Sequence, residues 1–120
     1  MIFKHLFPLA FATAVLAPAA PALAESFTRI ETDAAFKKQV ANRQLLQGEN
    51  TVTIRKNGKF SGVFGGTKYK GVWQWRDGYW CRTLTAPQEN TDCQMIEVGG
   101  GKMRLTRQRG KGKVQIYSFK

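Results

Sequence analysis

Between residues 50 and 119, residues that form tight turns divide the chain into short segments. This close spacing of turns constrains the fold more than any other feature of the sequence. Within the segments, apolar and polar side chains alternate with the period of two that is typical of half-buried β-strands. The Asn57-Gly58 dipeptide is a strong hairpin signal, because both central positions of a type I′ turn have positive φ. The turn signals are Asn57-Gly58, Gly65-Gly66, Asp77-Gly78, Gly99-Gly100-Gly101 and Gly110-Lys111-Gly112.

These turns delimit about seven short strands, and a succession of hairpins favours an antiparallel meander. The predicted strands are 51–55, 59–64, 67–76, 79–84, 93–98, 102–107 and 114–119. A polar loop is expected over 85–91, around Pro87. We therefore expect a mainly β domain that forms either a small barrel or a strongly curved sheet.

One short helix is predicted before the strands, from Thr32 to about Leu46. Thr32 or Asp33 can cap its start with a side-chain oxygen. Phe36 and Val40 are four residues apart, so they share one face of the helix. The basic side chains of this segment then lie mostly on the solvent side.

The first 24 residues have the three parts of a secretory signal peptide. Lys4 supplies a positive charge near the start, an apolar run covers 6–17, and Ala22-Leu23-Ala24 offers the small residues of a cleavage site. The apolar run is shorter than the roughly 20 residues of a membrane-spanning helix, and it contains proline. We expect cleavage after Ala24, a mature chain without an integral membrane span, and a periplasmic or secreted location.

Residues 25–120 would then form a single domain with one modest core. The formal net charge of the whole chain is +11 at pH 7, and loss of Lys4 lowers it by one. Such a charge favours a polyanionic partner, for example anionic lipid, lipopolysaccharide or an acidic envelope glycan. Nucleic acid is not expected in this compartment. The charge is explained equally well by a need for solubility alone.

Cys81 and Cys93 are the two cysteines of the chain, and an even count in an exported domain predicts a disulfide. The bond would close a loop of about 13 residues and stabilise the domain by roughly 3 kcal/mol. A metal site is the weaker alternative. The single histidine, His5, would leave with the signal peptide, and two thiolates are too few ligands. No cofactor is expected.

The segment around Asp77-Gly78 is the richest candidate for a binding site. A two-residue turn pairs Trp75 with Trp80. The same register places Trp73 beside Arg82, so the three tryptophans share one face of the hairpin. They form either part of the core or a surface on which sugars or bases stack. Arg82 either stacks on Trp73 or reaches out of the mouth of the barrel.

A second candidate is a basic run near the C-terminus, which could bind phosphate or sulfate groups. Its members are Lys102, Arg104, Arg107, Arg109, Lys111 and Lys113. We take Arg104, Arg107, Arg109 and Lys111 as candidate ligand-binding residues. A solvated strand edge, whose cations discourage aggregation, is an equally good explanation of the run.

The residue types argue against an enzyme. Without a mature histidine the domain lacks the commonest general base, and oxidation of both cysteines removes the thiol nucleophiles. The carboxylates show no spacing that specifies a catalytic pair. The glycines of 62–66 do not form the full fingerprint of a phosphate-binding loop.

Three stretches carry a resemblance that spans most of the mature part. The most specific is 71–82, Gly-Val-Trp-Gln-Trp-Arg-Asp-Gly-Tyr-Trp-Cys-Arg, followed by 92–94 and 107–112. On these residues the chain resembles a group of small exported alphaproteobacterial proteins of unknown function, and it is similar to domains of unknown function of the DUF995 type. The resemblance implies one compact β domain, a disulfide between Cys81 and Cys93, and no established catalytic residues.

Proteins of this kind are often labelled dihydrodipicolinate reductase, but such a reductase needs a dinucleotide-binding βαβ unit, which the pattern of hairpins does not provide. The first hypothesis is therefore a periplasmic, non-enzymatic binding module for an anionic or glycan-like ligand. One alternative is an envelope accessory protein, either structural or an inhibitor that plugs another exported protein. The remaining alternative is an enzyme that matches the reductase label.

Overall fold

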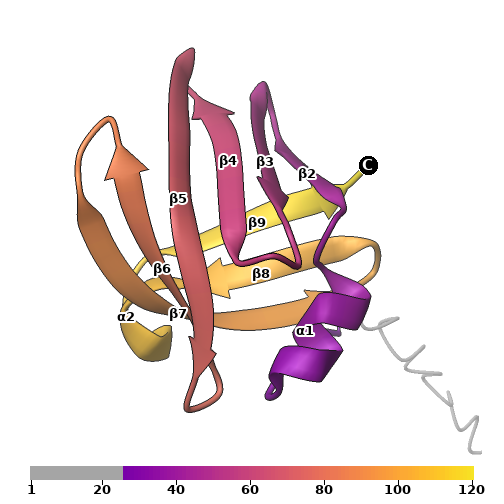
Figure 1. Ribbon diagram of the computed structural model, residues 1–120. Coiled ribbons are helices and arrows are strands. Elements are labelled where there is room, and N and C mark those ends of the chain that lie inside the picture. Colours follow the sequence, from indigo (N-terminus) through magenta and orange to yellow (C-terminus); the bar gives the residue numbers. More distant parts are fainter. Residues whose placement is uncertain (1–25) are drawn as a thin grey trace, which may run out of the picture.

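The computed structural model of this chain describes residues 26–120 (Figure 1). The predicted signal peptide, 1–24, and its cleavage site lie outside the described residues. In chain order the elements are β1 (Thr28–Arg29), α1 (Asp33–Gln39), β2 (Gln44–Gln47), β3 (Asn50–Ile54), β4 (Lys59–Phe64), β5 (Thr67–Arg76), β6 (Tyr79–Ala86), β7 (Asn90–Gly99), β8 (Lys102–Thr106), α2 (Arg107–Gly110) and β9 (Val114–Phe119).

Strands β2 to β9 form a closed antiparallel barrel. Each strand pairs with the next along the chain, and β9 pairs back with β2, which leaves no open edge between the first and last strands. The short strand β1 pairs with the second half of β7, through Thr28 with Val98 and Arg29 with Glu97. Because β6 pairs with β7 only as far as Gln94, β1 continues the wall beside β7 where β6 has ended.

The predicted mainly β barrel is confirmed, with eight barrel strands in place of about seven. The bounds of β4, β5 and β9 agree with the predicted ones. The strand missing from the prediction is β2, because the helix was extended to Leu46. That extension was wrong: α1 ends at Gln39, and Asn42 has a left-handed φ of 61° that no helix continues through.

The segment of β2 joins the barrel because its neighbours require it. Leu45 is fully buried and lies opposite both Val52 of β3 and Phe119 of β9. Asn42 also leads the chain into the strand, since its backbone N–H donates to the carbonyl oxygen of Ile54 at 2.6 Å. Pairing on both sides therefore outweighs the helical propensity of a four-residue segment.

Three smaller predictions also differ. The polar loop is shorter than 85–91, because β6 runs to Ala86 and β7 begins at Asn90. The predicted strand 102–107 ends one residue early, at Thr106. At Asn57-Gly58 only the glycine has positive φ, so this connection is not the predicted type I′ turn. Asp77 and Gly78 do both have positive φ, as a type I′ turn requires.

Helix α1 closes one end of the barrel, at the lower right in Figure 1. Thr32 caps it through a hydrogen bond from the backbone N–H of Ala35 to its Oγ1, at 3.2 Å. Phe36 is fully buried and inserts among the tryptophans. Its ring centroid lies 5.1 Å from that of Trp73 and 5.2 Å from that of Trp75. The helix therefore contributes a plug to the core.

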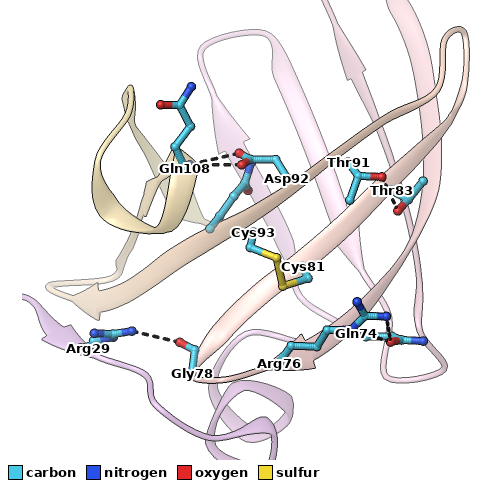
Figure 2. Close-up of a disulfide and its surroundings, with 11 residues drawn as sticks. Arg29, Gln74, Arg76, Gly78, Cys81, Thr83, Thr91, Asp92, Cys93 and Gln108 are labelled. Atoms are coloured by element: carbon cyan, nitrogen blue, oxygen red, sulfur yellow. Dashed lines mark hydrogen bonds between the residues drawn. A yellow bond between two sulfur atoms is a disulfide. The ribbon is translucent and has the colours of Figure 1, made fainter.

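The disulfide between Cys81 and Cys93 is confirmed. The two residues lie directly opposite each other on β6 and β7, with Cα atoms 3.9 Å apart (Figure 2). Their neighbours in the same strands, Trp80 and Gln94, face the barrel interior, so the disulfide lies on the outer face. Within residues 26–120 no helix has the length and apolar character needed to cross a bilayer.

Candidate ligand-binding cavity

The register predicted for the hairpin of β5 and β6 is confirmed, with Trp75 opposite Trp80 and Trp73 opposite Arg82. All four side chains face the interior. Trp73 and Trp80 are buried, at 6% and 3% exposed, and Trp75 packs half-buried against the core. The tryptophans therefore belong to the core and do not form an exposed stacking surface.

The indole N–H groups of the three tryptophans differ in their partners. Trp73 Nε1 donates to the carbonyl oxygen of Arg55 at 2.9 Å, and Trp75 Nε1 donates to that of Glu31 at 3.1 Å. Trp80 Nε1 is buried and has no hydrogen-bond partner within the described residues. Trp80 also lines the largest part of the barrel interior that is left open, the cavity formed with Arg82 and Gln94.

This cavity, of about 210 Å³, lies inside the barrel. Its apolar wall comes from β3, β4, β6 and β8, and the ring of Tyr69 adds β5: Val52, Ile54, Phe60, Phe64, Tyr69, Trp80, Leu84, Met103 and Leu105. Phe36 stacks behind Trp80, with ring centroids 6.3 Å apart, so α1 supports the cavity from its end of the barrel. The half-buried members, such as Phe64 and Leu84, lie toward the opposite end, where the turn 65–66 joins β4 to β5.

The polar part of the cavity is centred on Arg82. Only 8% of this residue is exposed, and its Nη1 donates to Asn90 twice, at 3.0 Å to the carbonyl oxygen and 2.7 Å to Oδ1. Burial lowers the pKa of Arg82, as does the charge of Arg107, while the charge of Asp92 raises it in part. Within residues 26–120 Arg82 forms no ion pair. A buried cation without a directly bound carboxylate is a costly arrangement.

Asp92 is the carboxylate closest in the sheet, since it lies opposite Arg82 on β7. Its oxygens are engaged elsewhere. Oδ2 accepts a hydrogen bond from Gln94 Nε2 at 3.0 Å, and the backbone N–H of Gln108 donates to Oδ1 at 3.2 Å (Figure 2). Asp92 thereby holds α2, in which Gln108 and Arg109 both have left-handed φ of 53°.

Helix α2 brings a second cation to the cavity. Arg107 is exposed but lines the cavity, and its Nε donates to Oε1 of Gln115 at 3.3 Å. Tyr117 lines the same space and is buried; burial raises its pKa, while the charges of Arg107 and Arg82 act in the opposite direction. Its phenol is therefore neutral at physiological pH and can donate a hydrogen bond.

Gln94 supplies an unused acceptor. The residue is 2% exposed and lines the cavity, and its Oε1 has no partner within the described residues. The hydrogen bond from its Nε2 to Asp92 fixes which amide atom is the oxygen. A buried polar atom left unpaired costs about 1–3 kcal/mol. The cavity therefore holds one unused donor, on Trp80, and one unused acceptor beside a buried guanidinium.

The structure does not gather the predicted basic run. Arg104 lies on the outer side of β8, where Nε and Nη2 donate to Glu97 at 3.0 and 2.7 Å, and the hydrogen bond to Glu97 raises its pKa. Arg109 lies over the ring of Tyr79, with Cζ 5.4 Å from the centroid, on the outside of β6. Lys111 is exposed beyond α2. Arg107 alone among these four lines the cavity.

The sequence interpretation missed Gln94, Asn90 and Tyr117, which complete the polar cluster. Gln94 had a signal of its own. It shares the inward face of β7 with Ile96 and Val98, two and four residues later. A polar residue on an otherwise apolar face indicates a hydrogen-bond partner in the interior. Asn90 lies in the segment predicted as a loop, where β7 begins beside β6. Tyr117 reaches the cluster only through the pairing of β9 with β8 and β2, which the sequence pattern does not specify.

Comparison with protein-family models, curated proteins and solved structures finds no match. The resemblance to small exported proteins of unknown function therefore stays a prediction. Function has to be argued from the cavity, because a barrel of this kind is compatible with many activities.

Proposed function

We propose that this protein is a non-enzymatic binding protein that encloses one small amphipathic molecule, with the apolar part in the barrel and a carboxylate or similar anionic group at Arg82. The observation that carries the proposal is the buried Arg82 guanidinium, which faces a cavity and has no carboxylate bound to it. An arginine presents several N–H donors in a planar fork that matches a carboxylate. Asn90 engages only Nη1, so Nε and Nη2 have donors available for a ligand.

The surrounding groups support the same ligand class. Trp80 Nε1 and the Tyr117 phenol are donors for an anion, and Arg107 adds a second positive charge. Gln94 Oε1 is an acceptor and favours a ligand that also carries a hydroxyl or the proton of an amide. The apolar wall supplies most of the remaining contact area, as is usual for ligand cavities.

The volume limits the size of the ligand. About 210 Å³ is more than the roughly 150 Å³ of a cavity that takes up benzene. It is below the roughly 300 Å³ at which pockets for drug-sized molecules begin. We therefore expect a ligand of about ten non-hydrogen atoms, such as a medium-chain fatty acid or an aromatic acid.

The proposed location is the periplasm or the extracellular space. The Cys81–Cys93 disulfide fits an oxidising compartment, and the N-terminal sequence has the pattern of a signal peptide. Within residues 26–120 no cluster of three His, Cys, Asp or Glu side chains is placed to hold a metal ion. We assign the cavity to binding because an apolar wall and a few hydrogen-bonding groups around Arg82 are what a ligand cavity requires.

The test compares octanoate, octanol and octylamine as probes, titrated by calorimetry and by tryptophan fluorescence. We expect octanoate to bind at least about tenfold more tightly than the other two, because a hydrogen bond to a charged group contributes about 1.5–3 kcal/mol. Arg82→Met should remove this preference. Arg76→Met is the matched control, because this substitution removes the same charge from the outer side of the same hairpin.

Arg107→Met provides a second variant in case Arg82→Met does not fold, because Arg107 is exposed. It should weaken octanoate binding and leave octanol binding unchanged. Equal affinity for all three probes would contradict the role of Arg82. Absence of binding for all three would contradict the assignment of the cavity itself.

A further inference from the structure

The outer side of β3, β4 and β5 is a second charged feature, separate from the cavity. Residues 50–76 contain no aspartate or glutamate. Six cations of this region are exposed, of which Lys56 lies in the turn after β3. We call the other five the basic face: Arg55, Lys59, Lys68, Lys70 and Arg76. They alternate with interior residues such as Gly71 and Trp73, so they share the outer surface of the barrel.

The charge of the basic face is not neutralised by the rest of the described structure. Within residues 26–120, none of its five cations pairs with a carboxylate. Arg55 Nη1 donates to Ser61 Oγ at 3.0 Å, and Arg76 donates to Gln74 Oε1, so both arginines have neutral partners. In contrast, Arg104 and Lys37 elsewhere on the barrel and helix are bound by Glu97 and Asp33.

Hydroxyl groups lie between these cations. Ser61 pairs with Thr53 on one side and Lys70 on the other, and Val63 pairs with Lys68. A depression of about 520 Å³ on this surface is lined by Thr51, Thr53, Ser61, Gly62, Val63, Lys68, Tyr69, Lys70 and Ala86. Ammonium and hydroxyl groups together are suited to phosphate oxygens.

The aromatic and aliphatic side chains of the basic face indicate which kind of polyanion it binds, a lipid bilayer or a glycan or nucleic acid. Of its aromatic neighbours along the strands, Phe60 and Trp73 are buried, and the half-buried Tyr69 lines both the cavity and the depression. The face therefore presents one half-buried ring and no row of exposed aromatic rings of the kind on which successive bases stack. It does present Val72, which is 47% exposed and lies opposite Lys59. A valine surrounded by cations suits the boundary between lipid headgroups and acyl chains.

We propose that the basic face docks the protein on a bilayer of anionic phospholipid. Lysines and arginines contact the lipid phosphates, and Val72 is covered by the bilayer surface. Because the cavity is lined by inward side chains of the same strands, the docking surface and the cavity lie on opposite sides of the wall, and Tyr69 is the one residue that lines both the cavity and the depression.

The test measures partitioning of the protein, produced from the full chain, onto vesicles that contain phosphatidylglycerol in phosphatidylcholine. A cation near an anionic surface changes partitioning by about fivefold. Lys68→Gln/Lys70→Gln should therefore weaken binding about 25-fold. The matched control is Lys38→Gln/Lys113→Gln, which removes the same charge from exposed sites outside the basic face and should change binding less than about threefold.

Two further measurements separate a bilayer from other polyanions. Val72→Ser should weaken vesicle binding several-fold, because it removes the apolar side chain that the bilayer surface covers in the docked protein. Duplex DNA of the same total phosphate concentration should bind more weakly than the vesicles. Thermal melting of each variant confirms that it folds.

Equal losses in the two double variants would overturn the proposal, since they would show that net charge alone drives the binding. Binding to DNA at least as tight as to vesicles would also overturn it, in favour of a nucleic-acid surface. The proposal would also be overturned if wild-type protein at low salt partitioned equally onto vesicles with and without phosphatidylglycerol. None of these results bears on octanoate binding in the cavity.

Discussion

Replacement of Phe36 by alanine tests whether α1 acts as the plug of the barrel. The Phe36 side chain is 0% exposed, and its ring lies 5.1, 5.2 and 6.3 Å from the three tryptophan rings. Truncating a buried phenylalanine costs about 3–5 kcal/mol, and aromatic pairs contribute about 0.5–1.5 kcal/mol each beyond the area that they bury. We expect Phe36→Ala to lower the free energy of unfolding by about 4 kcal/mol.

Urea and thermal denaturation, followed by tryptophan fluorescence, measure this loss. For a domain of this size 1 kcal/mol shifts Tm by about 4–8 °C, so Phe36→Ala should lower Tm by at least about 16 °C. The free energy of unfolding of Phe36→Leu should lie between those of Phe36→Ala and the wild type. Lys38→Ala, on the exposed side of the same helix, is the control and should stay within about 0.5 kcal/mol of the wild type.

The same substitution also affects the cavity, because Phe36 lies behind Trp80. Removing its ring should extend the apolar space and allow a fatty acid longer than octanoate to bind. A loss of stability below about 1.5 kcal/mol with unchanged tryptophan emission would refute the reasoning, since it would show that α1 does not pack into the barrel.

Three further predictions concern stability. Replacing Cys81 and Cys93 by serine should lower the free energy of unfolding by about 3 kcal/mol, and reduction of the wild type should reproduce that loss in thermal melts. Burial raises the pKa of Tyr117, so its contribution is present below the unfolded pKa of about 10 and is lost as pH rises through the folded pKa; Tyr117→Phe should flatten the decline in stability above pH 10. Gly71→Ala should cost about 1–3 kcal/mol in urea unfolding, because a Cβ there would lie 2.6 Å from two ring carbons of Phe60, and a neutral effect would contradict this packing.

The parts of the fold that follow from neighbouring residues were predictable. Asp77-Gly78 forms a turn with positive φ at both positions, and this turn sets the pairing of Trp75 with Trp80. The register in turn places Arg82 on the same face as the tryptophans. The Cys81–Cys93 disulfide was equally accessible, because it needs only the residue count and an oxidising compartment.

The β2 segment could not be predicted in the same way. Four residues, Gln44–Gln47, are too few to show a period of two, and their composition also suits a helix. They form a strand because β9, more than 60 residues later in the chain, pairs with them and closes the barrel. Closure of the barrel depends on contacts between residues far apart in the chain, so a short sequence segment cannot predict it.

For the candidate site, the sequence by itself determined which side chains share a face of each strand, and therefore that Arg82 accompanies the tryptophans. The tertiary structure alone decided that this face is the inside of a closed barrel. Closure converts a possible stacking surface into core, and it brings Tyr117 of β9 to the same cavity as Arg82 and Gln94 of the neighbouring strands β6 and β7. The physical reason is that strand alternation depends on neighbouring residues, whereas an enclosed volume depends on how all eight strands and α1 pack together.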